Sequence, residues 1–334
     1  MRVLLTGGTG FVGPATARAL SRRGHEVRCL VRETSDRKGL LETGCPLAFS
    51  IGDVLDPASL PTAIEGVDAV VHVAGLTKTL SSEDFYRVNA DGTKNLVEAT
   101  VRAKVSRFVH CSSLAVAGPM LQGRPVSEED PPAPVSHYGK SKLLAEEAVR
   151  RFTGQLALTV IRPPIVYGPR DHDFFEVFKM AQRGVALKPG LFGSKRYSII
   201  YVEDLGSSLA LALDEGDSVR ADDPASGTYY VSDGGVYTWE EMIRAVGRAL
   251  GKDNTVIVPV PETLSWGAGL WGELAGRLSG KPQIVSFDKI REVGGPGWAC
   301  SVDRAKHKLG YAPAFPLGRG LAETAAWYRE NNWI

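Results

Sequence analysis

The sequence predicts a doubly wound α/β fold, in which helices cover both faces of a parallel sheet. Three observations predict it. Short runs rich in Val, Ile and Leu alternate with helical stretches through the first half of the chain. The runs are apolar at nearly every position, as in strands that are buried on both faces. The first run leads directly into a glycine-rich turn and a helical stretch, the order of a dinucleotide-binding unit.

The expected elements follow in chain order. Strands are expected at residues 3–6, 26–31, 46–50, 69–74, 108–112 and 157–161. Helices are expected at residues 15–23, 36–42, 57–65, 83–103 and 137–152, with a last one at 318–331. Because a helical stretch separates each pair of strands, the strands are expected to run parallel.

The alternation stops after Arg162. The stretch 163–169 is rich in proline, and less regular elements follow it. We therefore expect residues 1–162 to form the dinucleotide-binding domain, with part of 195–235 returning to it. Residues 163–334 are expected to form mainly a smaller, substrate-binding C-terminal part.

The composition narrows the class of protein. With 334 residues, 43% hydrophobic and 23% charged, the chain resembles an ordinary soluble protein. A net charge of +1 gives no electrostatic reason to bind nucleic acid or an anionic membrane. No stretch is long enough to be a transmembrane segment, and no leader is expected before the first strand. The four cysteines are scattered and the six histidines lack ligand spacing, so we expect a cytoplasmic protein without a metal site.

The glycine-rich turn is the first functional motif. It reads Thr6-Gly7-Gly8-Thr9-Gly10-Phe11-Val12-Gly13. We expect Gly7 and Gly8 to let the chain bend. Gly10 would let the backbone approach a pyrophosphate, and Gly13 would let the helix pack on the strand. The N–H groups and the positive end of that helix would then face the phosphates.

The residues after the second strand favour NADP(H), with NAD(H) as a possible alternative. An NAD site usually has an acidic residue about 20 residues past the glycines, where it holds the ribose hydroxyls. Val31 occupies this position, Arg32 follows it, and Arg37 and Lys38 begin the next helix. Such cations suit a 2′-phosphate. Two alternatives stay open: the cations are solvated surface charges, or Glu33 serves a ribose.

Asp53 follows the third expected strand. Its carboxylate is placed to accept a hydrogen bond from the amino group of an adenine. An aspartate at this point of a chain also commonly caps a helix or a turn. Both interpretations stay open from the sequence.

Three side chains form a candidate catalytic group. Tyr138 and Lys142 are four residues apart and share one face of a helix. A phenol has a pKa of about 10, and a nearby ammonium lowers that pKa. The lysine can also hold the nicotinamide ribose. Ser112 and Ser113 end the fifth strand at the ligand-binding edge of the sheet, where a hydroxyl can orient a substrate oxygen. Joined with the glycine turn, this set predicts an enzyme.

The motifs together resemble the extended branch of the short-chain dehydrogenase/reductase family, which has a Rossmann fold. The matching segments are 6–13, 53–54, 72–75, 88–93, 112–113, Tyr138 with Lys142, 162–169 and 202–205. The resemblance implies that Ser113 is the catalytic serine, with Ser112 as the fallback. It also implies a cofactor site built from Gly7, Thr9, Gly10, Phe11, Val12, Gly13, Arg32, Asp53, Val54, Ala74, Gly75, Tyr138, Lys142, Pro163, Ile165 and Val166.

Within that family the chain is similar to the 3β-hydroxysteroid dehydrogenase and dihydroflavonol reductase group. This similarity implies interconversion of a secondary alcohol and a ketone on a fairly apolar small molecule. A nucleotide-sugar epimerase or dehydratase is the first alternative, although no Asn stands in the segment 163–166, where those enzymes usually carry one. A non-catalytic dinucleotide sensor is the second. The resemblance also suggests a homodimer formed through the helices at 83–103 and 138–152.

Several other residues have simpler interpretations. Asn89 is expected to be structural, and His72 and His110 to be core histidines with their hydrogen bonds satisfied. His137 is expected at the surface where a helix starts. Phe174 and Phe175 could form a substrate lid or pack in a core.

A second glycine motif, at 267–272, is rejected as a nucleotide site because no helix entry or acidic partner accompanies it. The apolar helix expected at 262–280 would pack within the C-terminal part, cover the pocket or touch a membrane.

Overall fold

A parallel sheet of seven strands forms the central layer of the mainly N-terminal part of the structure. The computed structural model describes residues 1–120, 123–190, 194–252, 254–261, 288, 291–292, 295 and 297–334. The strand order in the sheet is β11-β6-β5-β4-β1-β2-β3, and every pair is parallel. The strands are β1 (Arg2–Thr6), β2 (Glu26–Val31), β3 (Leu47–Ile51), β4 (Ala69–His72), β5 (Arg107–Cys111), β6 (Ala157–Arg162) and β11 (Thr228–Tyr230).

All the strands predicted for the first half are therefore confirmed, with ends that differ by two residues at most. The largest difference is at β4, which ends at His72 instead of residue 74. There the chain leaves the ladder to pass the glycine turn, where Ala74 lies against Gly7.

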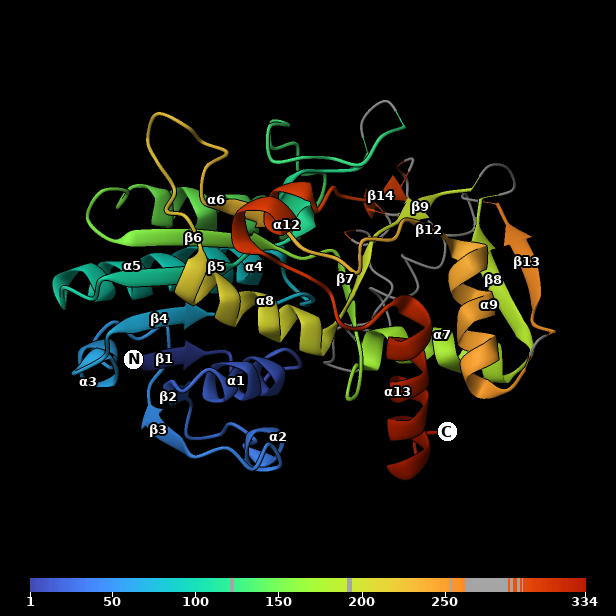
Figure 1. The fold of residues 1–334 in the computed structure, drawn as a ribbon, viewed down its shortest axis with the longest axis horizontal. Helices are drawn as coiled ribbons and strands as arrows, with labels where there is room; N and C mark the ends of the chain where they lie inside the picture. The colour runs from blue at the N-terminus through green and yellow to red at the C-terminus, as the bar shows by residue number, and fades with distance from the viewer. Residues whose placement is uncertain are drawn as a thin grey trace.

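Helices cover both faces of this sheet, which confirms the doubly wound fold (Figure 1). One face packs against α1 (Gly13–Arg22), α8 (Val202–Glu215) and α12 (Asp303–Leu309). The other face packs against α3 (Leu60–Ile64), α5 (Gly92–Arg102) and α6 (His137–Arg150). Gly206 of α8 approaches α1 so closely that a Cβ there would lie 2.6 Å from the carbonyl carbon of Ala15.

The helix predicted at 83–103 is interrupted. The chain forms α4 (Ser82–Phe85), then a π-helical turn at Tyr86–Asp91, and then α5. Asn89 lies in the π-helical turn, where its amide bonds to the backbone of Leu76 and to Ser141 Oγ. The widened turn and these three bonds occur together, and sequence periodicity shows neither. The expected structural role of Asn89 is confirmed.

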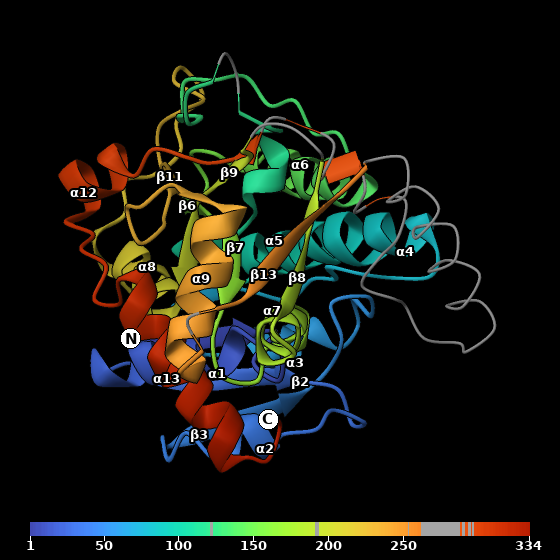
Figure 2. The same ribbon diagram turned by 90° about the vertical axis from the view of Figure 1, so that its right-hand side faces the viewer.

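The C-terminal elements lie beside the carboxyl ends of the sheet strands (Figures 1 and 2). They include α7 (His172–Gln182), β8 (Val185–Pro189), α9 (Trp239–Leu250), β13 (Val256–Val260) and α13 (Leu317–Glu330), the last of which confirms the helix predicted at 318–331.

Smaller ladders join β7 (Ile165–Tyr167) to β10 (Ile199–Tyr201), β8 to β13, and β9 (Arg196–Tyr197) to β12 (Tyr237–Thr238) and β14 (Gly297–Trp298).

Phe174 and Phe175 belong to an aromatic core in this part of the chain. Phe174 is buried, with its ring 5.5 Å from that of Tyr167. The ring of Phe175 lies 4.9 Å from Tyr328 and 5.1 Å from Trp333. These contacts confirm core packing for Phe174, and they favour it for the half-buried Phe175.

Asp171, which begins α7, makes the stability of the fold depend on pH. Its carboxylate accepts from the N–H groups of Asp173 and Phe174, and burial raises the pKa of Asp171 to about 7 despite these bonds. A carboxyl group whose pKa is raised in the folded state stabilises the fold fully at a pH below its unfolded pKa, near 4. That stabilisation is lost as the pH rises through about 7.

We therefore compare the free energy of unfolding of Asp171→Asn with that of the unmodified chain at two pH values. The difference is expected to favour the variant by about 1–2 kcal/mol more at pH 8 than at pH 5. The asparagine keeps one accepting oxygen and carries no charge to bury. Thermal unfolding at pH 5, 6, 7 and 8 measures the effect, with the exposed Asp303→Asn as the control. Equal pH slopes for Asp171→Asn and the unmodified chain would contradict the expectation.

Candidate active site

The glycine turn is built so that side chains are excluded at two points. Gly7 has φ +74°, and a Cβ there would lie 2.5 Å from the backbone nitrogen of Ala74. A Cβ at Gly13 would lie 2.1 Å from the carbonyl oxygen of Gly8, so Gly13 lets the helix close on the turn instead of on the strand. Gly10 is exposed, and among the described residues only the Gly7 carbonyl oxygen would contact a Cβ there, at 3.3 Å. The turn therefore leaves an open backbone face at the start of α1, which suits a pyrophosphate.

We expect Gly13→Ala to weaken binding of NADPH and NADH more than tenfold. The new methyl group would force the start of α1 away from Gly8, so the N–H groups would no longer converge. Fluorescence titration of the cofactors measures this. Gly318→Ala, at a helical position with open space around it, is the matched control and should bind as the unmodified chain does. Unchanged binding in Gly13→Ala would contradict the expectation.

A continuous series of contacts joins the glycine turn to the candidate catalytic residues. Gly7 abuts Ala74, and a Cβ at Gly75 would lie 3.8 Å from Lys142 Nζ. Lys142 Nζ donates to the carbonyl oxygen of Cys111 at 2.7 Å. Cys111 ends β5, so the expected cofactor residues and the lysine of the Tyr-Lys pair meet at one edge of the sheet.

The start of α6 lies against the same strand end. A Cβ at Gly139 would be 2.5 Å from the carbonyl oxygen of Ala115, so the first turn of α6 packs on the residues that follow Ser113. Tyr138 is in that turn, half-buried, with its ring 5.8 Å from the ring of Phe85. The structure thus brings the Tyr-Lys pair and the serine pair into one region.

The two serines have different surroundings. Ser112 is buried, and its hydroxyl donates to Glu146 Oε1 at 2.6 Å. Ser113 is half-buried, and its hydroxyl accepts from the N–H of Ala115. Because that contact uses one lone pair, the Ser113 hydroxyl keeps its hydrogen for another acceptor. This geometry favours Ser113 over the fallback Ser112 as the residue that holds a substrate oxygen.

Lys142 is buried, and burial lowers its pKa below the usual value, although Cys111 and Glu146 oppose the shift. Lys142 lies one helical turn after Tyr138 in α6. An ammonium close to a phenol favours the phenolate form.

A buried ion pair supports this region, and the sequence did not reveal it. Glu146 of α6 receives two hydrogen bonds from Arg162 at the end of β6, at 2.8 and 2.7 Å. Arg162 also donates to the hydroxyl of Tyr230 at 2.9 Å. All three side chains are buried. Burial raises the pKa of Glu146, but the charge and hydrogen bonds of Arg162 outweigh it, so the pKa lies below its usual value.

The predictions for the three histidines have different outcomes. His72 is buried and bridges Thr6 and Thr93 through its two ring nitrogens, at 2.6 and 2.8 Å, which confirms it as a satisfied core residue. Burial lowers its pKa to about 3. The prediction for His110 is wrong in part: it is buried, but within the described part of the chain neither of its ring nitrogens finds a hydrogen-bond partner. His137 does begin α6, but half-buried and bonded to Tyr86 Oη at 2.9 Å.

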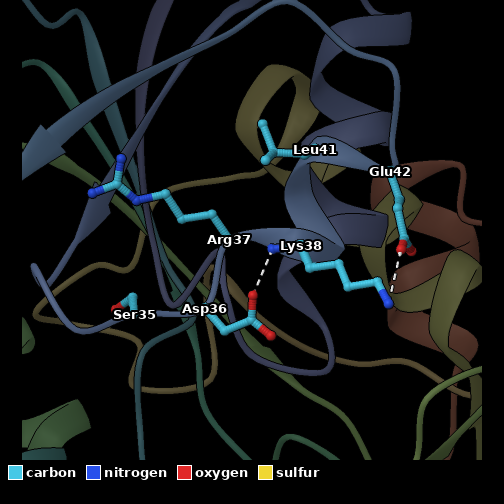
Figure 3. Close-up of a pocket in the computed structure, with 6 residues that line it drawn as sticks. All are labelled: Ser35, Asp36, Arg37, Lys38, Leu41 and Glu42. Atoms are coloured by element: carbon cyan, nitrogen blue, oxygen red, sulfur yellow. Dashed lines mark hydrogen bonds and ion pairs between the residues drawn. The ribbon is translucent and has the colours of Figure 1, made fainter.

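A hollow of about 610 Å³ lies beside α2 (Lys38–Leu41), where the cations expected to suit a 2′-phosphate stand (Figure 3). It is lined by Ser35, Asp36, Arg37, Lys38, Leu41 and Glu42. Figure 3 shows Arg37 and Lys38 pointing in opposite directions, and Arg37 lies over the ring of Phe49. Arg32 is exposed at the end of β2, and its N–H donates to Ser35 Oγ. Of these three cations, Arg32 is the one whose side chain has no ring or carboxylate contact among the described residues.

The other predicted cofactor residues lie along the same edge. Asp53 Oδ1 accepts from the N–H of Leu55, so its role in a turn is confirmed, and an adenine contact stays a prediction. Val54 is buried against Gly92. The carbonyl of Pro163 accepts from Leu114 N–H, beside Ser113, and Ile165 starts β7 two residues later. Thr9, Phe11, Val12 and Val166 are half-buried.

Comparison with known proteins identifies the family. The sequence profile of the NAD dependent epimerase/dehydratase family matches residues 3–225. The chain belongs to this family. The expected resemblance to extended short-chain dehydrogenases/reductases is thereby confirmed, as is the expectation of an NAD-dependent oxidoreductase of the epimerase/dehydratase type.

Relatives within the epimerase/dehydratase family cover the chain almost completely. It is 32% identical to ceramide reductase of Caulobacter vibrioides (strain NA1000 / CB15N), over 99% of this chain and 96% of that protein. It is 28% identical to 3-beta-hydroxysteroid dehydrogenase of Mycolicibacterium neoaurum, over 98% and 92%. The structure of UDP-glucose 4-epimerase from Thermus thermophilus in complex with NAD matches with a TM-score of 0.76 at 25% identity, over 98% and 99%.

No helix in the described part of the chain is long and apolar enough to cross a membrane. The predictions for the glycine motif at 267–272 and the helix at 262–280 lie outside the described residues.

Proposed function

We propose that the protein is an NADP(H)-preferring reductase or dehydrogenase that interconverts a secondary alcohol and a ketone on a fairly apolar substrate. The observation that carries the proposal is the convergence of Ser113, Tyr138 and Lys142 with the glycine turn at one sheet edge. The ceramide reductase and steroid dehydrogenase among the relatives support an apolar substrate. Their names describe those proteins, and the proposal extends that chemistry to this chain.

In the proposed reaction each residue has one task. When bound, the nicotinamide would supply the hydride that is added to the carbonyl carbon of the ketone. Tyr138 donates the proton from its phenol to the substrate oxygen, as a general acid. Ser113 donates its hydroxyl hydrogen to that oxygen and holds it in place. Lys142 favours ionisation of the Tyr138 phenol and anchors the ribose, while Ala74, Gly75 and the stretch from Pro163 to Val166 line the cofactor.

The preference for NADP(H) is assigned to Arg32, whose guanidinium suits a 2′-phosphate. We expect Arg32→Ser to raise the KM for NADPH about 10- to 100-fold, the size of a charged hydrogen bond lost, and to change the KM for NADH by less than threefold. Steady-state kinetics with both cofactors measures this, with the exposed Arg151→Ser as the control. Parallel changes with both cofactors would contradict the assignment.

The test of the whole proposal is a titration with NADPH and NADH, followed by a panel of ketosteroids, long-chain keto-lipids, β-keto acids and flavonoid-type ketones. Reduction of at least one apolar ketone is expected. Turnover of uridine or thymidine diphosphate sugars alone would favour a dehydratase or an epimerase, and the Thermus thermophilus structure is named as an epimerase. Tight NADPH binding with no turnover on either panel would favour a sensor.

The homodimer and the cytoplasmic location are part of the same proposal. Light scattering after size exclusion measures the dimer. Fractionation of cells that produce the protein measures its location.

A further inference from the structure

The first turn of α6, which carries Tyr138, is held by a carboxylate from the C-terminal part of the chain. Asp288 Oδ1 accepts from the N–H of His137 at 2.6 Å, and Asp288 Oδ2 accepts from the N–H of Tyr138 at 3.1 Å. These residues are 151 and 150 positions apart in the sequence. A second carboxylate, Glu292, accepts from the hydroxyl of Ser136 at 2.8 Å. Two acidic side chains therefore meet the start of α6 together.

The backbone of α6 needs these acceptors. The first N–H groups of any helix have no partner within the helix. Ser136, the N-cap residue, satisfies only one of them, by accepting from Gly139 N–H at 2.9 Å. Lys140 N–H makes the first bond within the helix, to the Ser136 carbonyl. Two N–H groups of the first turn remain, those of His137 and Tyr138, and the Asp288 carboxylate accepts from both.

We propose that Asp288 is a positioning residue of the candidate active site, whose carboxylate holds the first turn of α6 and thereby the Tyr138 phenol. This inference rests on the proposed function, because it assigns the proton transfer to Tyr138. Asp288 acts through the backbone of Tyr138 and the negative charge it brings to a helix N-terminus. It ties the C-terminal part of the chain to the proton donor in the Rossmann part.

Two effects follow from this arrangement. The bonds restrict the backbone of Tyr138, so losing them should lower kcat more than it changes cofactor affinity. The carboxylate also opposes ionisation of a neighbouring phenol, so removing its charge should move the basic limb of the pH–kcat profile to lower pH. Other titratable groups near Tyr138 also influence the basic limb, so the test leaves them unchanged. They are Lys142 and His137 on α6, Glu83 on α4, Tyr86 in the π-helical turn, and Glu292.

The experiment compares Asp288→Asn and Asp288→Ala in the full-length chain. Asp288→Asn keeps the shape and one accepting oxygen, and is expected to shift the basic limb down by about half a pH unit, the effect of one charge at a helix end. Asp288→Ala is expected to show the same shift and about a tenfold lower kcat, with the KM for NADPH within twofold. Amide exchange of the peptide that contains His137 and Tyr138 should be faster in Asp288→Ala.

Asp204→Asn is the matched control. The Asp204 carboxylate also accepts from two distant backbone N–H groups, those of Ala314 and Phe315, at 2.9 and 3.0 Å. Its variant should move neither the basic limb of the pH–kcat profile nor the amide exchange of the α6 peptide. An unchanged limb and unchanged kcat in a folded Asp288→Ala would overturn the inference, as would equal shifts in both variants and the control.

Tyr138→Phe in the same assays separates this inference from the proposed function. If Tyr138→Phe stays active, the proposed proton donor is wrong, whatever Asp288 does. If Tyr138→Phe is inactive and Asp288→Ala behaves as the unmodified chain, only the role of Asp288 is wrong. The exchange measurement needs no substrate and reports the contact directly.

Discussion

Replacing Tyr138 by Phe is expected to lower kcat by a factor of about 10²–10⁴, the usual contribution of a positioned general acid. The ring can keep its contact with Phe85, 5.8 Å away, so the change removes the phenol oxygen and little packing. Binding of NADPH should change by less than threefold. The measurement is single-turnover reduction of the best ketone, together with cofactor titration.

Tyr86→Phe is the matched control for this prediction. Tyr86 packs beside the same helix, and its hydroxyl bonds only to His137 among the contacts of the described residues. Its variant should keep kcat within about threefold. If Tyr138→Phe retained more than a tenth of the unmodified kcat with NADPH bound, Tyr138 would not be the proton donor.

The second large effect is expected at the buried pair of Glu146 and Arg162. Glu146→Gln leaves the guanidinium of Arg162 buried without a charged partner, and should lower the free energy of unfolding by about 3–5 kcal/mol. The double variant Glu146→Gln/Arg162→Met should lose less, because it removes both charges. Equilibrium unfolding in urea measures the free energy of unfolding of the unmodified chain, the single variant and the double variant.

An exposed pair provides the comparison for that measurement. Arg220 and Asp222 form an ion pair at 2.7 Å with both side chains mostly exposed. Asp222→Asn should leave the unfolding midpoint unchanged within error, because water and salt screen such pairs. An equally small effect of Glu146→Gln would show that the buried pair contributes little to stability.

Much of the fold was predictable because its signals are local. An apolar run of five residues shows a buried strand, and the glycines after β1 show a turn that no other residue can form at Gly7 or Gly13. The spacing of Tyr138 and Lys142 shows a shared helix face. Each of these patterns depends on neighbours in the sequence, so the structure reproduces them.

The rest of the site depends on contacts between distant parts of the chain. Nothing near Asp288 or Arg162 in the sequence indicates that these side chains meet α6. Ser113 is favoured over Ser112 because of the position of Glu146, which accepts from the Ser112 hydroxyl. His110 differs for the same reason: His72 finds Thr6 on β1 and Thr93 on α5, whereas neither ring nitrogen of His110 finds a partner among the described residues.

The π-helical turn at Tyr86–Asp91 makes chain length itself a part of the site. An α-helix advances about 100° per residue, so deleting one residue from this turn would rotate Phe85 by that angle relative to α5. Phe85 would then leave Tyr138, although no residue of the site had been substituted. Most surface segments tolerate an insertion or deletion. In this turn a change of length would move Phe85, so we expect the number of residues to matter as much as the identity of a catalytic side chain.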